Sequence, residues 1–243
     1  MKNIKPHQKN LDIYEQIKQN TKQSSIETKR QHPYSKVDLW KAFQKEYLIL
    51  HSKTFLYNDD NVIKNIKPLF CYFLESDAFF ECRHLRTDIS APSFKKGLLL
   101  FGNVGVGKSH IMQTFQSLFA KYQPHRFTMT PTHEVVDKYE ATKSPEDRNH
   151  FYKTFTNGTI LFDDLNSEKV ANNFGHVNIM KEVILRRCTL NKKTHLIMNP
   201  LPGFEDDTNG SLLKLGDNYD QRMVDRFYEM FNIIELKGKS MRR

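Results

Sequence analysis

The sequence has little that would suit a membrane protein, a disulfide scaffold or a zinc protein. Its longest unbroken apolar run covers residues 69–74, whereas a helix that crosses a bilayer needs about 20 apolar residues. The three cysteines include no C-x-x-C pair, and the ten histidines do not lie beside them at metal-ligand spacing. Residues 1–10 are polar and lack the apolar segment of a signal peptide. We therefore expect a soluble, cytoplasmic protein with no membrane partner and no structural disulfide or zinc.

Positive charge is plentiful, and its excess over negative charge is confined to the two ends of the chain, because residues 46–236 sum to −1. The formal net charge is +9. Residues 1–45 contain ten Lys/Arg against four Asp/Glu, and residues 237–243 contain four Lys/Arg and no acid. Such segments bind nucleic acid or acidic partners, because each phosphate that they neutralise releases counterions; the alternative is a solvated tail. Both interpretations are compatible with the composition.

The first 92 residues divide into two parts by composition. Residues 1–36 are rich in Lys, Gln, Asn and Ser, which predicts a basic arm that orders only against a partner. Residues 37–92 have apolar side chains at helical spacing, which predicts an accessory helical region. We expect one helix to begin with Asp38 as its N-cap and a second to be kinked or divided at Pro68. The aromatic residues here could face a partner, but their spacing favours a core; they are Phe55, Tyr57, Phe70, Tyr72, Phe73, Phe79 and Phe80.

After Pro92, short apolar runs alternate with amphipathic stretches, a pattern that is typical of parallel strands joined by helices. It predicts an α/β fold over residues 93–243. The strands are expected at 97–101, 125–130, 159–163, 195–199 and 232–236. The helices are expected at 108–122, 132–141, 145–155, 176–188 and 219–230.

A glycine-rich segment follows the first of these strands and matches the pattern G-x-x-x-x-G-K-[ST] at every fixed position. Glycines let such a loop curl so that its backbone N–H groups point at an anion, and the following helix adds its positive N-terminus. We therefore expect Lys108 to bind the β- and γ-phosphates of a nucleoside triphosphate and the Ser109 hydroxyl to bind Mg²⁺. The candidate nucleotide-binding residues are Gly102, Asn103, Val104, Gly105, Val106, Gly107, Lys108, Ser109 and the following His110.

Polar residues stand at the carboxyl ends of two further expected strands. Asp163 and Asp164 follow the apolar run that starts at Thr159, and Asn199 ends the strand expected at 195–199. Ligands of open α/β sheets bind at the carboxyl ends of the strands, so these three are candidate site residues. Asp163 would hold Mg²⁺, and Asp164 would orient or deprotonate the attacking water. Asn199 could bond that water and a γ-phosphate oxygen, although Asn before Pro is also ordinary turn chemistry.

Together these segments resemble the AAA+ ATPases, and in particular the DnaC-type helicase loaders and the IstB-type transposition helpers. Residues 102–109 resemble Walker A, residues 160–165 resemble Walker B, and Asn199 resembles sensor 1. Residues 221–242, with two arginines, an apolar strand and a Gly-x-Ser-x-Arg tail, resemble the C-terminal segment of the loaders. The resemblance covers residues 97–243 and does not extend to the N-terminal region.

The resemblance implies an AAA+ P-loop core without a full C-terminal lid, and an Mg²⁺-dependent ATPase that forms a homo-oligomer. Arg222 and Arg226 lie four residues apart on one helix face, so either could enter a neighbour's site as an arginine finger, with Arg222 the first choice. The alternative for both is a surface ion pair with nearby acids. Arg242 would stand in for the sensor 2 arginine, or would belong to a solvated basic tail.

The resemblance also implies a function in DNA replication. A helicase loader would bind ATP and Mg²⁺, single-stranded DNA through its ATPase ring, and a replicative helicase through residues 1–92. The alternative is an IstB-like ATPase that assists a transposase on duplex DNA. A third hypothesis is an interaction module that holds ATP as a structural ligand with little turnover.

Overall fold

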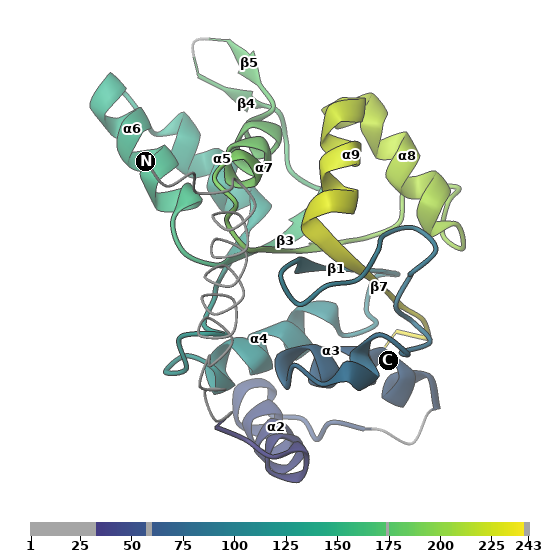
Figure 1. Cartoon of the computed structure of the whole chain (residues 1–243). Coiled ribbons are helices and arrows are strands. Elements are labelled where there is room, and N and C mark those ends of the chain that lie inside the picture. Colours follow the sequence, from purple (N-terminus) through teal and green to yellow (C-terminus); the bar gives the residue numbers. More distant parts are fainter. Residues whose placement is uncertain (1–32, 57–59, 174, 241–243) are drawn as a thin grey trace, which may run out of the picture. The chain divides into compact units, whose positions relative to one another are not determined.

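Five parallel strands form the main sheet of the computed structural model, which describes residues 33–56, 60–173 and 175–240 (Figure 1). Their order across the sheet is β2–β3–β6–β1–β7. They are β1 (Gly97–Gly102), β2 (Thr128–Pro131), β3 (Ile160–Leu165), β6 (Thr194–Met198) and β7 (Phe231–Leu236). All but the edge strand β2 are largely buried, which explains their continuous apolar runs. The α/β fold predicted from the sequence is confirmed.

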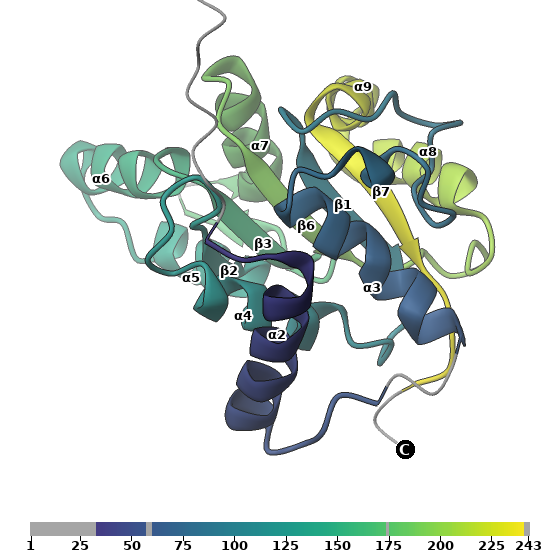
Figure 2. The ribbon, with the colours of Figure 1, turned by 60° about the horizontal axis from the view of Figure 1, so that its bottom comes forward.

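Helices cover both faces of this sheet, as Figures 1 and 2 show from two sides. Leu98 and Leu100 of β1 point into a core shared with three helices, whereas Leu99 and Phe101 point into a core shared with five others. The first layer contains α2 (Lys36–His51), α3 (Asp60–Phe73) and α4 (Lys108–Leu118). The second contains α5 (Thr132–Glu140), α6 (Pro145–Thr156), α7 (Ile179–Thr189), α8 (Thr208–Tyr219) and α9 (Gln221–Met230).

The helices predicted for the accessory region pack directly onto the helix that follows the phosphate loop. The ring centroid of Phe115 in α4 lies 5.1 Å from that of Phe43 in α2 and 4.6 Å from that of Phe73 in α3. The aromatic residues expected to form a core are buried at five positions: Phe55, Phe70, Tyr72, Phe73 and Phe79. Phe80 is 38% exposed, and Tyr57 lies outside the described residues.

The chain divides into two compact units, Met1–Pro33 and Tyr34–Arg243, and every element named here belongs to the second. The basic arm predicted over 1–36 therefore lies almost wholly outside the described residues. The division of the remainder at residue 92 stays a prediction. Among the described residues, no helix has both the length and the apolar character to cross a membrane.

Three expectations for the first 130 residues are corrected by the structure. The N-cap of α2 is Ser35 rather than Asp38, because the Ser35 hydroxyl accepts a hydrogen bond from the Asp38 amide at 3.2 Å. Pro68 does not divide α3, which continues through it to Phe73. The strand expected from His125 begins only at Thr128, since the His125 amide bonds the Tyr122 carbonyl in a turn.

Two C-terminal expectations are also corrected. The helix expected from His176 begins at Ile179, because His176 belongs to a short hairpin of β4 (Ala171–Asn172) and β5 (His176–Val177). Two helices, rather than one, lie between β6 and β7. The sequence pattern missed α8, which contains two glycines, residues with poor helix propensity. The remaining element within the described residues is the 3₁₀ turn η1 (Asp77–Phe79).

Candidate active site

The glycine-rich loop between β1 and α4 curls around the side chain of Lys108. Gly105 and Gly107 have φ angles of 87° and 90°, a left-handed conformation that glycine adopts without steric cost. The buried Lys108 ammonium donates hydrogen bonds to the carbonyl of Gly102 and, at 3.0 Å, to that of Asn103. The loop is therefore held at the carboxyl end of β1 by the cation that the motif predicts for phosphate binding.

Asn199 joins this lysine to the acidic strand end. Its Oδ1 accepts from Lys108 Nζ at 2.8 Å, and its Nδ2 donates to Asp164 Oδ1 at 2.7 Å. The cation and the carboxylate fix the orientation of the amide, because only its oxygen can accept and only its nitrogen can donate. The lysine at the start of α4 and the polar residues at the ends of β6 and β3 thus form one chain of contacts beside the end of β1.

Asp163 lies on the other side of this group, against the start of α4. The Ser109 hydroxyl donates to Asp163 Oδ1 at 3.1 Å. Neighbours in a regular strand point to opposite faces, but β3 shifts its register against β6 between Phe162 and Leu165, and Asp164 has φ 63°. This irregularity allows both adjacent carboxylates to reach the site, one to Ser109 and the other to Asn199.

The Asp163–Ser109 pair has the chemistry of a magnesium site. Burial raises the pKa of Asp163 above its usual value, the Asp164 carboxylate raises it further, and the Ser109 hydrogen bond and Lys108 oppose the change. A cation next to this carboxylate would favour its charged form. Among the described residues, His, Cys, Asp and Glu gather nowhere as a complete set of metal ligands. The two oxygen ligands therefore fit Mg²⁺, which usually keeps water and phosphate oxygens as its other ligands.

Thr132, the first residue of α5, was not predicted as part of the site. Its buried hydroxyl donates to the Asp164 carbonyl at 2.9 Å, and the Ser167 hydroxyl donates to the same carbonyl at 2.6 Å. These bonds support the left-handed backbone at Asp164. The sequence contains only a weak signal for this role, a threonine at the junction of an expected strand and helix.

Four predicted residues do not join this cluster. The ring of His110 stacks on His51 of α2 with 4.2 Å between ring centroids. The Arg226 guanidinium pairs with Glu229 on the exposed face of α9, which is the ion pair foreseen as the alternative to a finger. Arg222 is exposed on the same helix and its side chain has no ion-pair partner within the described part of the chain. Arg242 lies outside the described residues.

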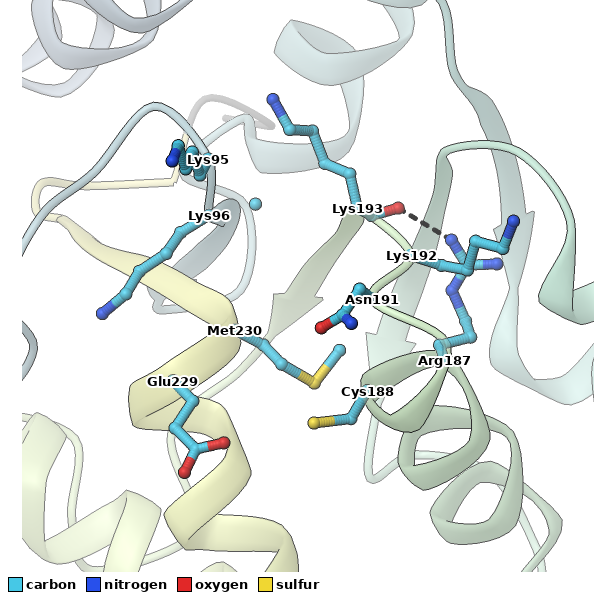
Figure 3. A pocket seen from close by; sticks show the side chains of 10 residues that line it. Lys95, Lys96, Arg187, Cys188, Asn191, Lys192, Lys193, Glu229 and Met230 are labelled. Atoms are coloured by element: carbon cyan, nitrogen blue, oxygen red, sulfur yellow. Dashed lines mark hydrogen bonds between the residues drawn. The ribbon is translucent and has the colours of Figure 1, made fainter. Parts of the chain in front are cut away.

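A separate basic cavity of about 360 Å³ lies at the opposite end of the strands, where β1 and β6 begin. Figure 3 shows Lys96, Arg187 and Lys193 around it. The buried Arg187 guanidinium bonds Thr194 and the carbonyls of residues 155, 158 and 193, and Lys96 and Lys193 also donate to backbone carbonyls. These cations therefore stabilise the turns that precede the strands.

Comparison with known proteins gives a match of structure alone. No family model matches the sequence, and no curated protein matches it. A DnaC helicase loader structure matches with a TM-score of 0.51 and 19% identity over 79% of this chain and 99% of that one. A putative primosome component from Streptococcus pyogenes matches with a TM-score of 0.51 and 15% identity over 83% and 98%. The DnaI structure matches with a TM-score of 0.50 and 18% identity over 77% and 88%.

The chain shares the fold of these three structures. The predicted α/β fold, a parallel sheet flanked by helices, is therefore confirmed, with the strand order β2–β3–β6–β1–β7. At these identities the likeness establishes the fold alone.

Proposed function

We propose that this chain is an Mg²⁺-dependent ATPase that acts in DNA replication as a DnaC-like helicase loader, binding single-stranded DNA and a replicative helicase. The ATPase part rests on three hydrogen bonds behind the glycine-rich loop. Asn199 bonds both Lys108 and Asp164, and Ser109 bonds Asp163. These contacts join a phosphate-binding cation, a metal-binding pair and a carboxylate that can act on water. The helicase-loader fold supports the replication part.

Binding of ATP would begin with an exchange of partners at Lys108. Its ammonium now donates to two loop carbonyls and to Asn199, and phosphate oxygens would replace some of these neutral acceptors with charged ones. Ser109 Oγ and Asp163 would hold Mg²⁺, which neutralises charge on the triphosphate when it is bound. The N-terminus of α4 begins at Lys108, and the positive end of a helix favours an anion there.

The hydrolytic role falls to Asp164 and Asn199. Asp164 would accept a hydrogen bond from the attacking water, and the Asn199 amide would hold that carboxylate in place through the bond already present. An arginine from a neighbouring copy, Arg222 first, would neutralise charge on the transferred phosphoryl group. Turnover per molecule would therefore rise with protein concentration.

Two substitutions separate nucleotide binding from hydrolysis. Lys108→Ala should weaken ATP binding at least tenfold, because it removes the phosphate-binding cation. Asp164→Asn should leave binding within about threefold and lower hydrolysis by about 10²-fold or more, the scale of general-base catalysis. Lys121→Ala, at an exposed lysine, is the matched control. Hydrolysis at the wild-type rate by Asp164→Asn would exclude this mechanism, and binding without turnover by the wild type would favour the structural-ligand hypothesis.

The helicase contact is proposed for the N-terminal region, where α2 and the segment that follows it present apolar side chains to solvent. Ile49 is 61% exposed and Leu56 is 66% exposed, with Leu48 and Leu50 beside them. Ile49→Asp in the full chain should abolish retention of a purified DnaB-type helicase and leave ATP hydrolysis unchanged. Val170→Asp, at a 55% exposed residue outside this region, is the control. Equal retention by both variants would place the helicase contact elsewhere.

A further inference from the structure

The backbone that follows β7 is held by the side chain of a single buried residue. Asn65 of α3, 3% exposed, donates from Nδ2 to the Lys237 carbonyl at 2.6 Å and accepts from the Lys237 amide at Oδ1 at 2.9 Å. One side-chain amide thus satisfies both backbone groups of Lys237, as an adjacent strand would. We call Asn65 and its two bonds to Lys237 the asparagine clamp.

The clamp is itself fixed by its surroundings. His84 Nδ1 lies 2.9 Å from the same Asn65 Oδ1, and since that oxygen can only accept, His84 must donate. The backbone beside His84 pairs antiparallel with β7: the Glu235 amide donates to the His84 carbonyl at 2.9 Å, and Leu85 forms a bridge with Ile234. Asn65 therefore has one orientation, and Lys237 has one position.

Beyond the clamp, residues 238–240, the tail segment, pass over the phosphate loop. A Cβ atom built on Gly105 would lie 2.2 Å from Ser240 Oγ and 3.3 Å from Ser240 Cα. The register of β7 against β1 explains this course, because Leu236 is paired with Gly102, the first residue of the loop. Gly105 is thus a position where both the positive φ and the close approach of the tail segment require glycine.

We propose that Asn65 is a positioning residue for the nucleotide site: it keeps the tail segment on the phosphate loop and so slows the release of bound ATP. This inference rests on the proposed ATPase function. Because Ser240 packs against Gly105, the phosphate loop can open at this point only if the tail segment moves as well. A fixed Lys237 limits that motion, since Ser240 is only three residues further on. The clamp also connects α3, in the region proposed to contact the helicase, with the nucleotide site.

The first test is the rate at which the full chain releases a fluorescent ATP analogue, mant-ATP with Mg²⁺. Asn65→Ala should raise the release rate about tenfold and weaken the affinity accordingly. Asn232→Ala is the matched control, because Asn232 is also a buried asparagine that holds backbone, bonding the Ser93 carbonyl and amide and the Gly97 carbonyl. The control should lose thermal stability and keep the wild-type release rate. Equal acceleration by both variants would overturn the inference.

A second test asks whether Asn65 acts through the tail segment. Lys237→Pro, which removes the backbone N–H that donates to Asn65 Oδ1, should release mant-ATP about as fast as Asn65→Ala. Combining the two changes should add nothing further, because both remove the same restraint. Full additivity of the two effects, a wild-type release rate in Asn65→Ala, or slower release in either variant would overturn the inference.

Hydrogen exchange separates this inference from the proposed function. Without nucleotide, Asn65→Ala should speed exchange of the Lys237 amide, while Asn232→Ala should not; unchanged exchange in Asn65→Ala would overturn the clamp. A wild-type chain that binds no mant-ATP would overturn the proposed function, even if exchange confirmed the clamp. A wild-type chain that binds mant-ATP while Asn65→Ala releases it at the same rate would overturn the present inference alone.

Discussion

At the scale of single residues, the backbone conformation of Asp164 determines how the candidate site is assembled. Two adjacent acids in a regular strand would point to opposite faces of the sheet. The left-handed φ of 63° at Asp164 and the register shift beside it bring both carboxylates to one place. Thr132 supports that conformation through its bond to the Asp164 carbonyl. Backbone strain of this kind is typical of functional sites.

The amide of Asn199 gives a prediction about charge. In Asn199→Asp a carboxylate would pair with Lys108 and repel Asp164, whereas the native amide bonds both without net charge. We expect ATP hydrolysis to fall by about 10²- to 10³-fold, the scale of losing one preorganised hydrogen-bond group. Steady-state phosphate release measures the effect, with Asn191→Asp at an exposed turn as the control. Hydrolysis within threefold of the wild type would contradict the assigned role.

His195 gives a prediction about pH. It is buried in β6 and its Nδ1 accepts from the Leu98 amide at 3.0 Å. Burial lowers the pKa of His195 to about 3, and nearby Lys193 adds to the effect. In the unfolded chain the pKa returns to about 6.5, so between these values the unfolded state binds more protons and stability falls as the pH falls.

When the pH is lowered from 7 to 5, protonation of His195 in the unfolded chain should lower the free energy of unfolding by about 2 kcal/mol. Urea denaturation at the two pH values, compared between the wild type and His195→Gln, measures its share. Glutamine keeps a hydrogen-bond acceptor and does not titrate. The same pH dependence in both proteins would show that His195 is not the group responsible.

At the scale of secondary-structure elements, α9 carries its two arginines on an exposed face while Met223, Val224 and Phe227 anchor the opposite face in the core. Arg226 is paired with Glu229 in the same helix. Arg222, with no ion-pair partner in the described part of the chain, is therefore the better candidate to act in a neighbouring copy.

Mixing two inactive variants tests this role. Arg222→Ala would keep an intact nucleotide site without a finger, and Asp164→Asn would keep the finger with an inactive site. We expect each alone to have less than about one hundredth of wild-type hydrolysis, given the usual contribution of a trans-acting arginine. Their mixture should regain a clear fraction of the activity. A mixture as inactive as its parts would remove Arg222 from this role.

The elements differ in how far the sequence predicts them. The buried strands were predicted because continuous apolar runs bounded by turns have few other structures available, and the loop was predicted because its glycines and lysine follow such a run. Helix α8 was missed because two glycines and several polar residues weaken its periodicity. The contact of Asn65 with Lys237 could not be predicted, since it joins residues 172 positions apart. The φ of Asp164 depends in the same way on Thr132, from a different strand–helix junction.

At the scale of the whole molecule, part of the excess positive charge lies outside the compact unit that contains the candidate site. Residues 1–33 contain seven Lys/Arg against three Asp/Glu, whereas Tyr34–Arg243 forms a compact unit by itself. A net charge of +4, seven minus three, thus lies outside the unit that holds the candidate site.

Deletion of residues 1–33 should therefore leave the midpoint of thermal unfolding unchanged and alter binding to single-stranded DNA. We expect weaker binding and a shallower dependence of log affinity on log salt, by about 0.7 for each phosphate that the shortened chain no longer neutralises. A fluorescence titration with oligo(dT) at several salt concentrations measures both. An identical slope with and without these residues would assign them to a solvated tail.

The aromatic layer formed by Phe43, Phe73 and Phe115 has a consequence for how such a protein can change its partner in evolution. Exchanging the first 92 residues for those of a relative would leave the Phe115 ring facing side chains of another shape, and loss of that packing would cost stability. Gradual replacement of outward-facing side chains such as Ile49 avoids this cost. New specificity should therefore arise by drift of the surface rather than by recombination of modules.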